Sequence, residues 1–140
     1  MNRKLERRLV MIGSIWQITS GLLTIFLYAS YIKTEGLKTS YTSIANLEAA
    51  QSVFGSLYMF SVSFGMIFVI LGILNFVVAK TLKDDQTEVK KPIWFILVGL
   101  ASYFVMDILA SILFLSAGIL ALAKNKSISK LLNYQLEKQP

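Results

Sequence analysis

Three apolar segments, separated by short charged stretches, dominate the chain. Charged residues are absent from residues 9–32 and 53–79 and, apart from Asp107, from residues 93–123. A helix needs about 20 apolar residues to cross the hydrocarbon core of a bilayer. The first two segments, with 24 and 27 residues, are therefore each predicted to form one membrane-spanning helix. The first segment is also longer than the apolar part of a signal peptide and lacks a good cleavage site, so we expect it to be retained.

The third segment fits either one long helix or a hairpin of two short helices. A single helix of 31 residues would extend about 46 Å, whereas the hydrocarbon core is about 30 Å thick. Two helices over residues 93–106 and 109–123 would each extend only about 21 Å. Length does not decide between these interpretations, but three other patterns favour the hairpin.

The first pattern is the distribution of lysine and arginine. With four crossings, 12 of the 14 basic residues lie on one side of the membrane, and only Lys33 and Lys38 lie on the other. With three crossings the division is 8 to 6. Basic residues concentrate in cytoplasmic loops, so the four-crossing arrangement is favoured. It places both termini and the tail, residues 124–140, in the cytoplasm.

The second pattern is the position of the aromatic residues. In the four-crossing arrangement four tyrosines lie near the outer interface and Trp94 near the inner one, the levels that these side chains prefer.

The third pattern is Asp107 itself. In a single helix Asp107 would lie near the bilayer centre, at a cost of roughly 2.5–3.5 kcal/mol. At an outer turn it meets water and can cap the next helix. We expect the turn; a buried carboxylate that carries protons or ions is the alternative.

The predicted fold is an all-α membrane protein with a single integral membrane domain, residues 1–140. It is a four-helix transmembrane bundle with spans at about residues 9–32, 53–79, 93–106 and 109–123, the last two forming a short hairpin. In the tail, Ile128, Leu131, Leu132 and Leu136 recur at helical spacing. This spacing predicts an amphipathic helix at the inner membrane interface.

Small and polar residues along the spans are expected to pack the helices together, because helix association in lipid depends on close approach. The residues are Gly13, Gln17, Ser20, Gly21 and Thr24 in the first span, Ser61, Gly65, Gly72 and Asn75 in the second, and Ala117 and Ala121 in the last.

Composition narrows the chemistry. The chain has no cysteine and no histidine, which excludes disulfides, thiolate or imidazole metal ligands, and catalysis by either residue. No nucleophile–base set or phosphate-binding loop is present, so we expect no enzyme, no cofactor and no metal. The net charge of +6 is interpreted as contact with anionic lipid headgroups of the inner leaflet rather than with nucleic acid. The residues expected there are Arg3, Lys4, Arg7, Arg8, Lys124, Lys126 and Lys130.

The external loop, residues 33–52, is the one outer stretch long enough to recognise a partner. Its Ser/Thr cluster and Gly36 predict irregular chain, with a helix that begins before the second span. It is either a simple linker or a contact site for an extracellular peptide or protein.

The order of these features, from the basic N-terminus to a hairpin that ends FLSAGILALAKNK at residues 114–126, resembles a known family. The family comprises small four-span membrane proteins of Gram-positive bacteria and is defined only as a domain of unknown function. The resemblance implies a plasma-membrane location and a four-helix bundle. It transfers no active-site residue.

Three functions remain open. The first is a non-enzymatic accessory or interaction subunit that binds another membrane protein or a second copy of itself. The second is an immunity protein that protects its cell from a secreted toxin or bacteriocin through the outer loop. The third is a small transporter or channel component, which would need Asp107, Gln17 or Asn75 to line a path.

Overall fold

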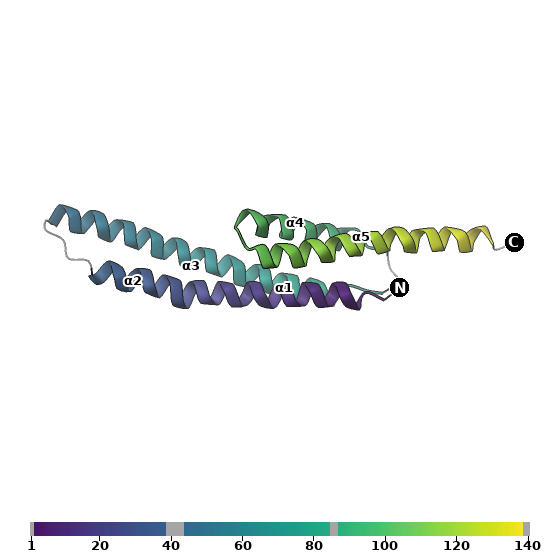
Figure 1. Cartoon of the computed structure of the whole chain (residues 1–140), viewed down its shortest axis with the longest axis horizontal. Coiled ribbons are helices and arrows are strands. Elements are labelled where there is room, and N and C mark those ends of the chain that lie inside the picture. Colours follow the sequence, from purple (N-terminus) through teal and green to yellow (C-terminus); the bar gives the residue numbers. More distant parts are fainter. Residues whose placement is uncertain (1, 39–43, 85–86, 139–140) are drawn as a thin grey trace. The chain divides into compact units, whose positions relative to one another are not determined.

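The structure is a computed structural model that describes residues 2–38, 44–84 and 87–138. Over these residues the chain is helical and contains no strand. The elements, drawn in Figure 1, are α1 (Lys4–Leu23), a single π-helical turn η1 (Thr24–Tyr28), α2 (Ala29–Lys38), α3 (Ile44–Lys80), α4 (Lys90–Phe104) and α5 (Ile108–Glu137).

Three helical stretches are long and apolar enough to cross a membrane: Lys4–Glu35, Leu47–Lys80 and Ile108–Tyr134. The prediction of an all-helical protein with transmembrane helices is confirmed at this level. Helix α4 has 15 residues and therefore extends about 22 Å, which is less than the thickness of a typical hydrocarbon core.

The chain divides into two compact units, Met1–Trp16 with Gly72–Pro140, and Gln17–Leu71. In the first unit α4 and α5 lie side by side as an antiparallel hairpin (Figure 1). Two glycines permit their close approach. A Cβ atom on Gly99 would lie 2.9 Å from the backbone nitrogen of Leu115, and one on Gly118 would lie 2.9 Å from the carbonyl oxygen of Pro92. Backbone atoms cannot give way to a new side chain, so these positions require glycine.

The core of the first unit is apolar and built largely from small or compact side chains. Val10, Ala79, Phe95, Ala110, Phe114 and Ala117 are buried there. Gly13 is part of the same packing, because a Cβ atom on it would lie 3.2 Å from the Phe114 ring. Alanine and glycine on one helix leave room for an aromatic ring from another, which gives dense packing without large matching surfaces.

In the second unit the end of α1, η1 and α2 run antiparallel to α3 (Figure 1). Their closest approach is at Gly21 and Gly65, where a Cβ atom on either would lie 2.7–2.8 Å from the other's carbonyl oxygen. Next to this contact, the Ala29 N–H donates to the Thr24 carbonyl across the π-helical turn. The Thr24 hydroxyl donates to the Ser20 carbonyl at 2.9 Å, which is the kind of side-chain bond that competes with regular helical bonding.

Two predicted elements differ from the structure. The outer loop was expected to begin as irregular chain, but α2 continues to Lys38. The expected helix start before the second span is present, because α3 begins at Ile44; residues 39–43 lie outside the described part. The tail was expected to form a separate helix, whereas α5 runs from Ile108 to Glu137 without a break. Nothing in residues 124–130 ends a helix, since this stretch contains neither proline nor glycine.

Candidate functional site

The turn between α4 and α5 is formed by Met106 and Asp107. Met106 takes a left-handed conformation with φ of 61°, a position usually occupied by glycine. The N–H groups of Met106 and Asp107 then donate back to the carbonyls of Tyr103 and Ser102, at 3.0 and 2.9 Å. This is the Schellman arrangement, which satisfies carbonyl groups that the end of a helix leaves open.

Asp107 is the N-cap residue of α5. Its Oδ1 accepts a hydrogen bond from the Ala110 N–H at 3.1 Å. The same oxygen accepts a second bond from the Trp16 indole Nε1–H at 3.0 Å. Oδ2 is buried and has no hydrogen-bond partner among the described residues. The expected turn at Asp107 is therefore present, and the carboxylate joins it to α1 rather than pointing freely into solvent.

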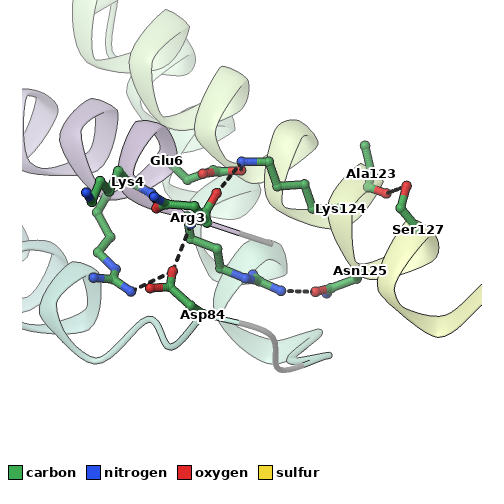
Figure 2. Close-up of polar contacts among 10 residues, drawn as sticks. Arg3, Lys4, Glu6, Asp84, Ala123, Lys124, Asn125 and Ser127 are labelled. Carbon is green, nitrogen blue, oxygen red and sulfur yellow. Dashed lines mark hydrogen bonds and ion pairs between the residues drawn. The ribbon is translucent and has the colours of Figure 1, made fainter. Parts of the chain in front are cut away.

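At the opposite end of the first unit lies a polar cluster, here called the ionic cluster: Arg3, Glu6, Arg7, Asp84, Lys124 and Asn125 (Figure 2). It joins the start of α1, the segment after α3 and the middle of α5.

Each of these three segments is joined to another by a charged contact. Asp84 Oδ1 accepts from the Arg3 backbone N–H at 2.8 Å and pairs with Arg7 at 2.9 Å. Lys124 pairs with the buried Glu6 at 2.6 Å, and the Arg3 guanidinium donates to Asn125 Oδ1. The hydrogen bond from Arg3 lowers the pKa of Asp84, and the positive charge of Arg7 acts in the same direction.

The ionic cluster corrects part of the predicted lipid-contact set. Arg3 is fully buried, and Arg7 and Lys124 are committed to carboxylate partners. A buried charge is destabilising unless it is paired, so the fully buried Glu6 carboxylate depends on its contact with Lys124. The other members of the predicted set, Lys4, Arg8, Lys126 and Lys130, are exposed and can reach headgroups.

The residues predicted to pack the helices occupy positions suited to that role. Nine of the eleven are buried and two are half-buried: Gly13, Gln17, Gly21, Ser61, Gly65, Gly72, Asn75, Ala117 and Ala121, then Ser20 and Thr24. Asn75 Oδ1 accepts a hydrogen bond from the Trp94 indole at 2.8 Å. Gly99 and Gly118 were not among the predicted packing residues, although glycine within a hairpin of apolar helices is itself a signal of close packing.

Helix α3 carries a second small-residue face that is not buried, here called the exposed small face: Ser52, Gly55, Ser56, Met59 and Ser63. A Cβ atom on Gly55 would have nothing within 4 Å. Ser52 and Ser61 are nine residues apart, or two and a half helical turns, so the exposed small face lies opposite the face that packs on α1. This face was not among the packing surfaces predicted from the sequence.

A groove of about 350 Å³ in the second unit offers little for a polar ligand. Its lining includes Tyr28, Phe60 and Phe64 together with the hydroxyls of Thr24 and Ser61. Both hydroxyls donate to carbonyls of their own helices. No three His, Cys, Asp or Glu side chains are grouped to hold a metal ion in the described part of the chain.

Comparisons of the chain with protein-family models, with curated proteins and with solved structures find no match.

Proposed function

We propose that this chain is a non-enzymatic, multi-pass protein of the plasma membrane that binds another membrane protein, or a second copy of itself, through the exposed small face of α3. Both termini lie in the cytoplasm in this proposal. The distribution of basic residues supports that orientation, because 12 of 14 then lie on the cytoplasmic side.

The observation that carries the proposal is the open space at Gly55. Large apolar side chains fill the lipid-facing surfaces of a membrane helix efficiently, whereas small residues do so poorly. Small residues at helical spacing are typical of surfaces where another helix approaches closely. Ser52 and Ser56 form such a pair beside Gly55, and the Ser56 hydroxyl is already bonded to the Ser52 carbonyl at 2.9 Å. The Ser56 hydroxyl therefore needs no polar partner on an approaching helix.

The proposal assigns the two small faces of α3 different roles. Gly65 holds α3 against Gly21 within the chain, and Gly55 is left for a helix from outside it. The unbranched Met59 side chain on the same face can adapt to the shape of that helix.

A photo-crosslinking amino acid at Met59 tests the proposal in cells. The control places the same amino acid at Val53, which is also exposed but lies off the small face. We expect a discrete protein adduct from Met59, and its loss when Gly55→Leu is added. A Cβ atom at Gly55 would have nothing within 4 Å, and leucine favours helix more than glycine does, so we expect the helix to be retained.

The identity of the adduct distinguishes a second copy from a different protein. An adduct that is the same from both positions, or that survives Gly55→Leu, would contradict the proposed docking face.

A further inference from the structure

The tip of the α4–α5 hairpin is apolar and open. Met106 and Phe104 are 85% and 82% exposed, the highest values among the large apolar side chains in the described residues. Val105, Ile108 and Leu109 are exposed beside them. An outer turn that meets water is normally polar, whereas this one presents large apolar side chains on all the residues around Asp107.

The backbone of the tip is largely satisfied from within. The N–H groups of Val105, Met106, Asp107 and Ser111 donate to carbonyls of the hairpin, and the Ala110 N–H donates to the Asp107 carboxylate. At a surface loop, backbone N–H and C=O groups can bond to water instead of to one another. Inside hydrocarbon it is required, because each unpaired backbone group costs several kcal/mol.

The charges of the hairpin lie at its other end. Counting along the helices, Lys91 is 16 residues and Lys124 is 17 residues from Asp107, or about 24 and 26 Å. Lys124 belongs to the ionic cluster, and Lys91 pairs with Glu88 at 2.5 Å. The stretch Ile108–Tyr134 is long enough to cross a membrane only because it includes Lys124, Lys126 and Lys130. If these charges and Lys91 lie outside the hydrocarbon, the uncharged part of each arm is too short to carry the tip through a core of about 30 Å.

The bond between Trp16 and Asp107 gives an independent measure of depth. Along the first membrane-crossing stretch, Lys4–Glu35, the last charge before Trp16 is Arg8 and the next one after it is Lys33. Trp16 lies 8 residues from Arg8 and 17 from Lys33, about 12 and 26 Å. Asp107 is therefore held at a level well inside the apolar stretch, nearer the end that carries Arg8.

We infer that the α4–α5 hairpin is re-entrant: it enters the bilayer from the side of the ionic cluster, turns inside the hydrocarbon and returns to the same side. The partner of its apolar tip is the acyl chains of the lipids. The inference rests on the membrane location and cytoplasmic termini proposed above, but not on the docking face of α3.

A re-entrant hairpin replaces the outer turn expected from the sequence. It retains the expected division of basic residues, because both arms begin and end on the cytoplasmic side. Two donors, the Trp16 indole and the Ala110 N–H, lower the cost of placing Asp107 in hydrocarbon by bonding to its Oδ1. Oδ2 has no donor among the described residues, so part of that cost remains.

Site-directed spin labelling tests the depth of the tip. The chain has no cysteine, so Met106→Cys introduces a single label site in the full-length protein, reconstituted in phosphatidylcholine and phosphatidylglycerol vesicles. We expect the label to collide often with oxygen, which partitions into hydrocarbon, and rarely with a water-soluble nickel chelate. Thr34→Cys and Lys126→Cys, both exposed, are the aqueous controls. Phe104→Cys repeats the measurement if Met106→Cys does not fold.

Labelling with an impermeant maleimide decides the side. A re-entrant tip remains unlabelled both in intact cells and in inside-out vesicles, and reacts only after detergent is added. Labelling from outside would show a hairpin that crosses the membrane, and labelling from inside would show one that lies in the cytoplasm; either result would overturn the inference. Neither result depends on whether Gly55 binds a partner.

Discussion

Two adjacent residues form the turn on which the arrangement of the C-terminal half depends. Met106 reverses the chain with a positive φ, and Asp107 caps the helix that follows. The first costs stability because a side chain in the left-handed region is strained by about 1–2 kcal/mol. The second recovers stability through hydrogen bonds to the Ala110 N–H and the Trp16 indole.

Asp107→Ala should destabilise the protein by about 1–2 kcal/mol, because α5 loses its cap and Trp16 loses its acceptor. Asp107→Asn should cost less than about 0.5 kcal/mol, since asparagine caps helices nearly as well. Unfolding by dodecyl sulfate in mixed micelles measures both. Equal losses for the two variants would contradict a capping role.

Met106→Gly should stabilise the protein by about 1 kcal/mol, because glycine adopts a positive φ without strain. Met106→Ala serves as the control: it removes the same exposed side chain but keeps the Cβ atom. A stability gain in the alanine variant as large as in the glycine variant would show that the side chain, not the backbone strain, is responsible.

The Asp84 carboxylate gives stability a dependence on pH. Its pKa is lowered in the folded state by the Arg3 N–H and by Arg7. The folded pKa thus lies below the usual value of 3.8. The charged carboxylate therefore contributes stability above about pH 3.8, and this contribution is lost as the pH falls through the folded pKa.

Asp84→Asn should therefore flatten the decline of the unfolding temperature below about pH 4 and leave its slope near neutral pH unchanged. Thermal unfolding of both proteins across this range measures the difference. An altered slope near neutral pH would point to another titrating group.

For single residues, the sequence predicts the role of Asp107 in a turn but not the partners of the residues in the ionic cluster. Asp107 stands out as the one charge in an apolar segment, so its role in a turn can be inferred. The partners of Arg3 and Lys124 cannot be inferred from the sequence. Arg3 and its partner Asn125, for example, are 122 positions apart. Basic residues beside membrane spans generally contact lipid headgroups, so these residues were predicted to do so. In the fold, Arg3 and Lys124 bind partners within the chain instead.

Helix α3 shows how one element serves two surfaces. Ser61 and Gly65 are buried within the chain, and Ser52, Gly55 and Ser56 are exposed on the opposite side. Apolar length and composition predict a long membrane-spanning helix over residues 53–79, which lies within α3. They do not predict which small residues are buried, because that depends on the contact of Gly65 with Gly21 and Ile25.

Gly65→Ala and Gly55→Ala form a matched pair of substitutions within α3. A Cβ atom at Gly65 would lie 2.6 Å from Ile25 Cγ1 and 2.8 Å from the Gly21 carbonyl oxygen, so the helices must separate. We expect a loss of about 1–3 kcal/mol. At Gly55 the Cβ atom meets nothing, and the better helix propensity of alanine should add up to about 1 kcal/mol. Dodecyl sulfate unfolding compares the two, and a similar loss at both positions would contradict the different roles of the two faces.

On the scale of the whole molecule, the account depends on which side of the membrane each end of the chain occupies. Charge distribution alone predicts that both termini lie in the cytoplasm. The α4–α5 hairpin allows this because its two arms run antiparallel (Figure 1). The Asn125 side chain, next to Lys124, donates to the Glu88 carbonyl just before α4, so the start of α4 and this part of α5 lie at the same end. A chain with only three crossings would instead place the end of α5 outside the cell.

The most direct measurement is therefore the accessibility of single cysteines in intact cells. Thr34→Cys lies just after the predicted first span, residues 9–32, and Lys126→Cys lies on α5 after the hairpin; both positions are exposed. The account predicts that an impermeant maleimide labels Thr34→Cys in intact cells and labels Lys126→Cys only after the membrane is permeabilised. Labelling of both cysteines in intact cells would contradict it, because the hairpin would then not return to the side of the N-terminus.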